Sequence, residues 1–450
     1  MKKLLACALA LALVSSRGAC KKTSSSAPAS SGGAPASGGS VYYLNFKPEI
    51  APVYDKIAAA YEAETGVRLH VVTAASGTYE QTLKSEIAKA DAPTLFQING
   101  PKGYAHWKDY CADLSGTELV AHLTDPSLAV SAGGKIYAIP YVVEGYGILY
   151  NDAILQKYFA TPGAKAKSVD EINSFSALKS VVEDMTAKKD TLGIRGVFAS
   201  TSLKPGEDWR WHTHLANLPL AYEFSANQVD LASDATREIR FQFADNFKKI
   251  FDLYLHNSVT EPKLLGSRQV ADSMAEFALG QCAMVQNGNW AWGQIREVAG
   301  NVVEEQNVRF LPIYTGMPEE EAQGLCIGTE NFFAINAQAS PEQQKLAADF
   351  IWWLYSSETG KRFVTEELGF IAPFDTFSEQ ERPADPLAQE VLRWMNKKDT
   401  VTIPWNFTVF PSQSFKDQFG AALLQYAQGT IGWDEVVSIV VSEWKSESAM

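Results

Sequence analysis

Beyond its first forty residues the chain has no apolar run that approaches the length of a membrane span. We therefore expect residues 41–450 to be soluble. Basic residues are also in short supply, because 39 Lys and Arg stand against 52 Asp and Glu and leave a formal net charge of -13. This surplus of negative charge argues against nucleic acid or an anionic lipid surface as the partner.

Residue types that bind metals or form disulfides are scarce, with 5 cysteines and 6 histidines in the whole chain. After residue 40 the cysteines are Cys111, Cys282 and Cys326. This odd, irregularly spaced set allows either one disulfide with a free thiol or three buried reduced cysteines. His212 and His214 form an H-x-H pair with no third candidate ligand nearby. The sequence therefore predicts no metal site and no cofactor.

The first residues do contain a targeting signal. A positively charged start precedes the apolar residues 4–14, a run too short to cross a bilayer but typical of a secretory signal. The run ends in Arg-Gly-Ala before Cys20 and resembles a bacterial lipobox. This resemblance implies a lipoprotein signal peptide over 1–20, with Cys20 lipidated at the outer face of the cytoplasmic membrane. Arg17 departs from the pattern, which has an aliphatic residue there, and Cys7 has too little apolar chain before it.

Residues 21–40 consist almost entirely of Ser, Ala, Gly, Pro and Lys. Such a composition cannot bury enough apolar surface to become ordered. We therefore predict a disordered tether whose ends lie on the order of 25 Å apart. The folded part begins at Val41 and is long enough for two domains of ordinary size.

Strand and helix patterns alternate after the tether. Residues 41–46, 67–72 and 94–98 have the pattern of strands, and residues 52–65 and 78–90 have that of helices. A strand, helix, strand, helix, strand series is a βαβ arrangement. The sequence thus predicts an α/β fold with a mainly parallel sheet.

The stretch AEFALGQCAMVQNGNWAW, residues 275–292, carries the strongest indication of a ligand site. It has a helix turn, a break at Gly280, a short buried strand, and then glycine and asparagine before two tryptophans. Open α/β sheets bind ligands at the carboxyl ends of their strands. We therefore expect Trp290 to stack on a ligand beside Asn289, whereas Trp292 is either a second contact or a core residue.

Five stretches together resemble a known family and keep its order along the mature chain. They are AAAYEAETGVRLHVV, ADAPTLFQIN, YAIPYVVEGYGILYN, FALGQCAMVQNGNWAW and FFAINAQASPEQQKLAADFIWWLYSSETGKRFVTEELGFIAPF. The chain is similar to the extracellular solute-binding proteins of carbohydrate ABC importers, the group that includes maltose-binding protein. The resemblance implies a periplasmic-binding-protein-like fold, in which two α/β lobes are joined by hinge crossings and the ligand cleft lies between them.

The resemblance also implies a division of the chain and a set of partners. The first lobe is expected to comprise 41–143 plus 328–368, and the second 144–327 plus 369–450. Gly145 and Gly147 suit a hinge at the first crossing, since hinges absorb backbone rotation while lobes move rigidly. The expected protein is a non-enzymatic monomer that binds a carbohydrate, an oligosaccharide, and passes it to a membrane-embedded ABC permease. It is expected to bind no nucleic acid and to contact the membrane only through its lipid anchor.

Candidate ligand contacts follow from the matching stretches and from the chemistry of strand ends. Glu144 matches a sugar-contacting carboxylate in relatives, unless it makes only a structural hydrogen bond in the hinge. Amide side chains both donate and accept, as vicinal hydroxyls require. The full set of expected contacts is Asn45, Phe46, Gln97, Asn99, Glu144, Tyr146, Trp209, Asn289, Trp290, Glu330, Asn331, Trp405 and Asn406.

Two other functions stay open on sequence grounds. Acidic groups among aromatic side chains also suit a cation such as a polyamine, and the carboxylates available for it are Glu80, Glu144, Asp208 and Glu330. A secreted carbohydrate-active enzyme would need two carboxylates, for which Glu144 and Glu330 are the candidates. Of the remaining tryptophans, we expect one of Trp352 and Trp353 in the core and the other partly exposed. Those expected to serve packing alone are Trp394, Trp433 and Trp444.

Overall fold

The structure is a computed structural model that describes residues 39–449 except residues 76, 201, 232, 319 and 379. All that follows concerns the described residues. The predicted signal peptide, Cys20 and most of the predicted tether lie outside the described residues. The tether ends slightly earlier than predicted, because the first strand begins at Ser40.

The first sheet has the strand order β10-β3-β1-β2. Strand β1 pairs in parallel with β2 and β3, and β10 is antiparallel to β3. The strands are β1 Ser40–Asn45, β2 Arg68–Thr73, β3 Leu95–Ile98 and β10 Phe332–Ile335. The helices with it, which together form the first lobe, are α1 Ala51–Thr65, α2 Tyr79–Glu86, α3 Gly100–Trp107, α4 Glu118–Ala121, α12 Pro341–Ser356 and α13 Glu358–Arg362. A hairpin of β4 Val130–Ala132 and β5 Lys135–Ala138 completes it.

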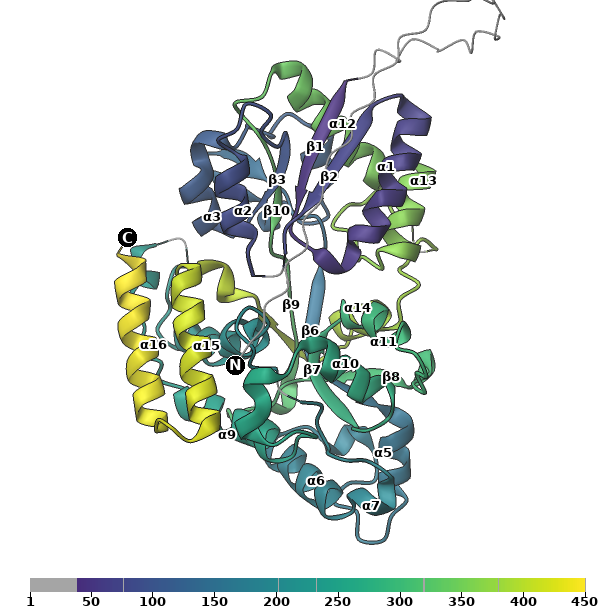
Figure 1. Ribbon diagram of the computed structural model, residues 1–450, viewed down its shortest axis with the longest axis vertical. Coiled ribbons are helices and arrows are strands. Elements are labelled where there is room, and N and C mark those ends of the chain that lie inside the picture. Colours follow the sequence, from purple (N-terminus) through teal and green to yellow (C-terminus); the bar gives the residue numbers. More distant parts are fainter. Residues whose placement is uncertain are drawn as a thin grey trace, which may run out of the picture. The chain divides into compact units, whose positions relative to one another are not determined.

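Alternation along β1 explains why helices cover both faces of this sheet. Tyr43 belongs to a core with α1 and α12, whereas the next residue, Leu44, belongs to a core with α2. Figure 1 shows α1 and α13 on one side of the sheet and α2 and α3 on the other. Helix α1 ends where predicted, at Gly66, whose φ is 71°. Helix α2 ends at Glu86, before its predicted end, and turn-forming Asp91 and Pro93 follow.

The second sheet has the order β11-β9-β6-β7, with β8 also paired to β6. Its strands are β6 Glu144–Asn151, β7 Met284–Gly288, β8 Val308–Leu311, β9 Gln323–Gly328 and β11 Val401–Pro404. Strand β6 is antiparallel to all three of its neighbours. The mainly parallel sheet predicted from residues 41–98 is confirmed for β1, β2 and β3, and that prediction did not extend to this second sheet. No local pattern reports strand direction, because pairing is decided by distant segments.

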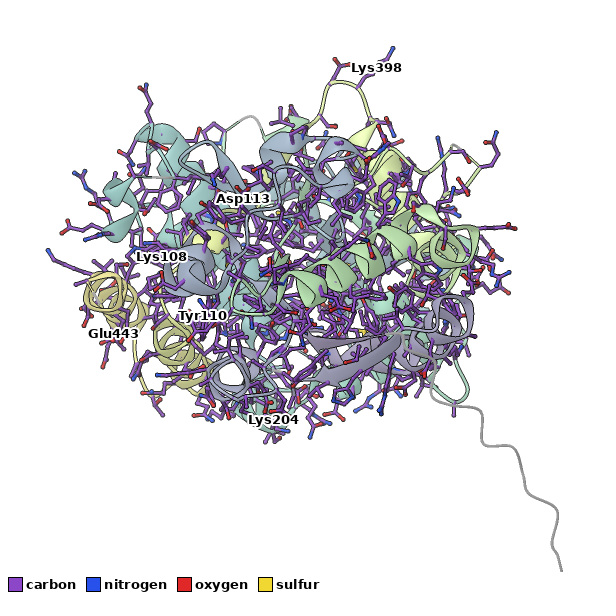
Figure 2. All side chains as sticks on the ribbon, turned by 90° about the horizontal axis from the view of Figure 1, so that it is seen from above. Lys108, Tyr110, Asp113, Lys204, Lys398 and Glu443 are labelled. Carbon is purple, nitrogen blue, oxygen red and sulfur yellow. The ribbon has the colours of Figure 1, made fainter. Side chains whose placement is uncertain are left out.

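Helices also cover both faces of the second sheet. Ile148 packs in a core with α6, α8 and α9, and Leu149 packs in a core with α10 and α14. The helices of this second lobe are α5 Asp152–Phe159, α6 Phe175–Ala187, α7 Lys189–Leu192, α8 Ala216–Ala226, α9 Ala244–His256, α10 Val270–Ala278, α11 Ala291–Arg296, α14 Pro386–Met395, α15 Gln413–Gln428 and α16 Trp433–Ser448. Helices α15 and α16 run side by side (Figure 1). Figure 2 shows exposed Lys398 projecting from the turn before β11.

Several sequence expectations about packing can be compared directly with the structure. Gly145 and Gly147 lie inside β6. A Cβ at Gly145 would come within 2.7 Å of the Val391 side chain, and a Cβ at Gly147 would come within 2.5 Å of the Leu311 carbonyl oxygen. Close packing therefore explains both glycines, and the hinge stays a prediction, as do the boundaries of the lobes. The three described cysteines are free and buried.

The tryptophans divide differently from the prediction in one place. Trp352 and Trp353 are both half-buried against the core of the first lobe, so the expectation that one is fully buried is wrong. The Trp353 Nε1 donates to Glu64, which keeps that ring at the surface. The tryptophans found buried as expected are Trp394, Trp433 and Trp444. Among the described helices none is long and apolar enough to cross a membrane.

Candidate functional site

Most of the predicted contacts follow the ends of strands. In each of the two sheets these strand ends lie at one edge. Phe46 follows β1, Asn99 follows β3, and Trp290 follows β7. Glu330 follows β9, and Trp405 follows β11. Strand β6 begins at Glu144, which pairs with Gly328 at the end of antiparallel β9. The antiparallel register therefore puts the start of β6 beside the ends of its neighbours.

Trp290 lies at the turn between β7 and α11, where it is the residue before the first helical position. Its ring lies against the backbone of Gly288, because a Cβ at that glycine would come within 2.2 Å of the indole. Trp290 is partly exposed, and its Nε1 is buried without a partner. Trp292 is 3% exposed and belongs to the core with α10 and α14. Of the two open interpretations of Trp292, the structure supports the core residue.

Trp209, His214, Trp290 and Trp405 form one aromatic cluster. The Trp290 ring centroid lies 5.8 Å from that of Trp209, 5.4 Å from that of His214 and 6.4 Å from that of Trp405. Trp405 packs on Gly328, where a Cβ would come within 2.5 Å of the indole. Tryptophans from three segments far apart in sequence thus pack together around His214.

A buried ion pair joins the first lobe to this cluster. The Lys47 Nζ, two residues after β1, lies 2.5 Å from a Glu144 carboxylate oxygen and 3.6 Å from Glu49. It also lies 5.4 Å from the centre of the Trp290 ring. Burial raises the pKa of Glu144, and the Lys47 ammonium opposes that rise. Glu144 is therefore a contact between the lobes, and Lys47 is a site residue that the sequence did not reveal.

A π-helix, η5 Arg210–Leu215, supplies two further buried groups. Such wide turns are rare and occur often at functional sites. The Arg210 guanidinium lies over the Trp209 ring, with its Cζ 3.9 Å from the ring centre. His214 is 4% exposed, and the Trp209 backbone acts on its ring as a hydrogen-bond partner. Burial and the Arg210 charge hold the pKa of His214 well below its usual value, so the ring is neutral.

Glu330 and Asn331 form the connection from β9 to β10. Burial and the neighbouring Glu144 charge raise the pKa of Glu330 to about 7. Asn331 has a φ of 58°, a left-handed conformation that asparagine tolerates better than most residues. Its carbonyl oxygen accepts from Gln97 Nε2 at 2.9 Å, and its own Nδ2 is buried without a partner.

Other predicted amide contacts are held by hydrogen bonds within the protein. The Gln97 Oε1 accepts from Phe46 N and from the Tyr43 hydroxyl. The Asn289 Oδ1 accepts from Gly145 N at 2.9 Å. The Asn45 Nδ2 donates to the Lys47 carbonyl oxygen and to the Thr73 hydroxyl. The Tyr146 hydroxyl donates to the His214 carbonyl oxygen, and the backbone N of Asn406 donates to the Asn217 Oδ1. These bonds give the residues a role in positioning the site, whereas Asn99 Oδ1, like Asn331 Nδ2, is buried without a partner.

Contacts between the lobes flank the cluster. A Cβ at Gly100, the first residue of α3, would come within 2.8 Å of Thr408 in η11 Asn406–Val409. A Cβ at Gly77 would come within 3.3 Å of the Gly206 backbone. The same helix α15 that packs beside η5 brings in Lys416, whose charge acts on Glu330. The cluster is therefore enclosed by both lobes.

The residues missed by sequence reasoning share a cause. Lys47 could have been found, because it continues the strand end Asn45-Phe46. Arg210 and His214 come from a π-helix, whose spacing matches neither the helical nor the strand period. Lys416 comes from a helix remote in sequence from every other member. Only the tertiary structure brings the Arg210 guanidinium over Trp209 and the His214 ring to Trp290.

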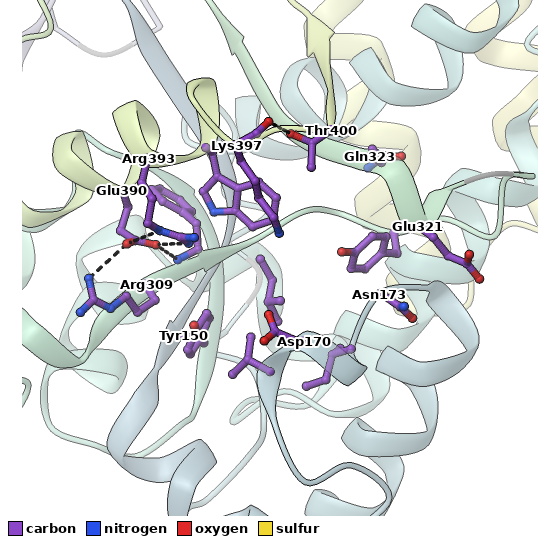
Figure 3. A pocket seen from close by; sticks show the side chains of 16 residues that line it. Tyr150, Asp170, Asn173, Arg309, Glu321, Gln323, Glu390, Arg393, Lys397 and Thr400 are labelled. Atoms are coloured by element: carbon purple, nitrogen blue, oxygen red, sulfur yellow. Dashed lines mark hydrogen bonds and ion pairs between the residues drawn. The ribbon is translucent and has the colours of Figure 1, made fainter.

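A cavity of about 480 Å³ lies elsewhere, in the second lobe, and none of the predicted contacts lines it. Figure 3 shows Tyr150, Asp170 and Arg393 around it. Its buried carboxylate, Glu390, is satisfied by Arg393 at 2.8 Å and Arg309 at 3.1 Å. The charged groups of this cavity neutralise one another, whereas polar groups at the aromatic cluster lack partners. We therefore place the candidate site at the aromatic cluster.

The H-x-H pair does not assemble a metal site from the described residues, where no group of three suitable ligands occurs. The His212 Nδ1 hydrogen bonds with the Thr213 hydroxyl at 2.8 Å, and its Nε2 lies 3.6 Å from Asp208. His214 instead faces the aromatic cluster. The two histidines therefore have separate surroundings.

Comparison with known proteins identifies the family. Residues 56–391 match the family described as bacterial extracellular solute-binding protein. Because this match spans well over half of the sequence, the chain belongs to that family, as the sequence resemblance predicted.

Individual relatives agree with the family. The chain is similar to the melibiose/raffinose/stachyose-binding protein MelE of Bacillus subtilis (strain 168), with 34% identity over 113 residues, 24% of this chain and 26% of that protein. The match thus spans about a quarter of the curated relative. Among solved structures, RafE in complex with raffinose has a TM-score of 0.68 at 17% identity and covers 91% of this chain and 99% of its own. A sugar transporter from Bacillus licheniformis in complex with stachyose has a TM-score of 0.65 at 17% identity over the same shares. These likenesses confirm the periplasmic-binding-protein-like fold.

Proposed function

We propose that this protein captures an oligosaccharide between its two lobes and delivers it to an ABC permease. The observation that carries the proposal is a set of buried polar atoms without partners around one aromatic cluster. They are the indole nitrogens of Trp290 and Trp405, Nδ2 of Asn331 and Oδ1 of Asn99. Buried polar groups are normally hydrogen bonded, so such a concentration of exceptions calls for an absent partner.

The chemistry of the unpartnered atoms suits a sugar. Indole and amide N–H groups donate, and the Asn99 oxygen accepts. A sugar hydroxyl also donates and accepts, and the apolar face of a sugar ring packs on indole. The names of the relatives, for melibiose, raffinose and stachyose, point in the same direction.

A polyamine is a poorer match for the same space. The aromatic faces that would receive an organic cation already carry the protein's own cations, Lys47 over Trp290 and Arg210 over Trp209. Glu144, which was to attract such a ligand, is paired with Lys47. We therefore rank the carbohydrate above the cation.

A hydrolytic role for Glu144 and Glu330 is also less well supported. The Lys47 ammonium, 2.5 Å from Glu144, occupies the carboxylate that would have to act as nucleophile or base. The family is one of binding proteins. An assay for released reducing sugar, with raffinose and stachyose as substrates, decides this point, because measurable release would establish an enzyme.

The test of the proposed function is a thermal-shift screen followed by calorimetric titration. Raffinose, stachyose, and malto-, xylo- and chito-oligosaccharides are compared with putrescine and spermidine. A ligand at a hundred times its dissociation constant adds about 2.7 kcal/mol of stability and raises the melting temperature. Stabilisation by a polyamine alone would contradict the proposal.

We further propose that Cys20 carries a lipid anchor that holds the protein at the outer face of the cytoplasmic membrane. The support is the apolar run at 4–14 and the small residues before Cys20. Cys20→Ala should move the protein from the membrane fraction to the medium. Wild-type protein that is already free and lacks a lipid mass would contradict the anchor and point to Arg17 as the reason.

A further inference from the structure

Arg210 is a buried cation whose charge the protein leaves without an ion-pair partner. The residue is 5% exposed. Its Nε donates to the Asn287 Oδ1 at 3.1 Å, and its Nη1 is buried without a hydrogen bond. No described carboxylate forms an ion pair with it, although Glu49 and Glu207 act on it from farther away. Burial lowers the pKa of this guanidinium to about 9, a measure of how poorly its charge is compensated.

Lys47, in the same site, is a buried cation that has carboxylate partners. Lys47 has Glu144 at 2.5 Å and Glu49 at 3.6 Å. Lys416, in contrast, has no ion pair among the described residues, and burial lowers its pKa. Glu330 is the carboxylate that acts on it most strongly, and burial raises the pKa of Glu330 itself. Arg210 therefore differs from Lys47 in having no described carboxylate within ion-pair distance.

We propose that the oligosaccharide bound here is acidic and that a uronic acid carboxylate in it pairs with Arg210. The inference rests on the proposed function and adds the chemical class of the sugar. A guanidinium is suited to a carboxylate, because its planar N–H groups can bind both oxygens. A buried cation without a partner is costly, and a ligand carboxylate would remove that cost on binding. The face of Trp209 holds the guanidinium in place for this contact.

One structural alternative accounts for part of the observation. A cavity of about 10 Å³ beside Arg210 is lined also by Gln286, whose Oε1 is buried without a partner. A single water there would satisfy both hydrogen-bonding groups. It would leave the charge uncompensated, so the alternative predicts that Arg210 is structural and indifferent to the charge of the ligand.

Matched sugars that differ only in charge separate these possibilities. Calorimetric titration compares digalacturonic acid with galactobiose of the same linkage, and cellobiouronic acid with cellobiose. We expect an acidic member to bind at least about thirtyfold more tightly than its neutral counterpart, the factor typical of a buried charge pair. Arg210→Gln should abolish that preference, so that the acidic and the neutral sugar bind with similar affinity. An unchanged circular dichroism spectrum shows that the variant is folded.

Two further variants serve as controls. Arg210→Lys, which keeps the charge but not the planar pair of donors, should retain part of the preference. Arg195→Gln removes an exposed arginine of the same lobe and should change nothing. If neutral sugars bind as well as acidic ones, or if the preference survives Arg210→Gln, the inference fails while the proposed function stands. If no sugar in this set or in the first screen binds, the proposed function fails, and the inference with it.

Discussion

At the scale of single residues, the indole of Trp290 offers the sharpest test of the site. Trp290→Ala removes the central face of the aromatic cluster and a donor that has no partner within the protein. A stacked tryptophan in the middle of an interface typically costs at least 2 kcal/mol when truncated, roughly thirtyfold in affinity. Calorimetric titration with the sugar found in the screen measures the loss, and Trp290→Phe should recover part of it.

Trp353→Ala is the control for this prediction. Trp353 is half-buried in the first lobe and donates to Glu64, away from the aromatic cluster. Its removal should lower the melting temperature and leave the affinity nearly unchanged. A Trp290→Ala protein that melts early but binds normally would show that the indole serves packing only.

Glu330 gives the site a pH dependence whose sign follows from burial. Its pKa is raised from 4.5 to about 7 in the folded state. Between those values the folded protein keeps a proton that the unfolded chain has lost, so stability falls as pH rises through this window. Above about pH 7 the loss is complete. Glu330→Gln lacks the titrating proton and therefore lacks this part of the pH dependence.

The measurement is the free energy of unfolding in urea at pH 5 and pH 8. From the lower to the higher pH the wild type should lose on the order of 1–3 kcal/mol more than Glu330→Gln. Glu366→Gln, at an exposed position of the first lobe, should follow the wild type. Parallel pH profiles for the wild type and Glu330→Gln would mean that water reaches the Glu330 carboxylate freely.

At the scale of elements, the turn from β7 to α11 positions the tryptophan through a missing side chain. Gly288→Ala puts a Cβ within 2.2 Å of the Trp290 ring. The ring must move, and overpacking of this kind costs about 1–3 kcal/mol. We expect reduced ligand affinity together with a lower melting temperature. Titration and differential scanning calorimetry of the same variant measure both effects.

Gly293 provides a matched control inside the same element. A Cβ there would meet nothing within 4 Å, and the residue lies in helix α11. Gly293→Ala should therefore leave the affinity unchanged and add up to about 1 kcal/mol of stability through helix propensity. Equal affinities for the two alanine variants would show that the Trp290 ring adapts to the added methyl group without loss.

At the scale of the whole molecule, ligand binding should favour closure of the lobes. Lys47 and Glu144 meet across the two lobes, as do Gly100 and Thr408. A ligand that contacts both lobes binds the closed form better and must shift the population towards it. Small-angle X-ray scattering should therefore record a smaller radius of gyration at saturating sugar. An unchanged radius would contradict the hinge.

Sequence and tertiary structure determined different parts of this protein. Local patterns were enough for β1 to β3 and for α1, whose end at Gly66 depends on a left-handed glycine, and they located Trp290 at a strand end. Such features depend on neighbouring residues alone. The family resemblance added the fold, because five matching stretches in order are a property of the whole chain.

The charges of the site were decided by the tertiary structure. No sequence pattern paired Lys47 with Glu144, brought Arg210 and Lys416 to the aromatic cluster, or reversed β6 against its neighbours. The sequence also could not reveal that the side chains of Gln97 and Asn289 hydrogen bond within the protein, whereas Asn99 Oδ1 and Asn331 Nδ2 lack partners. The reason is physical, since burial and ion pairing depend on which distant segments meet, and a side chain's chemistry is set by the neighbours it acquires on folding.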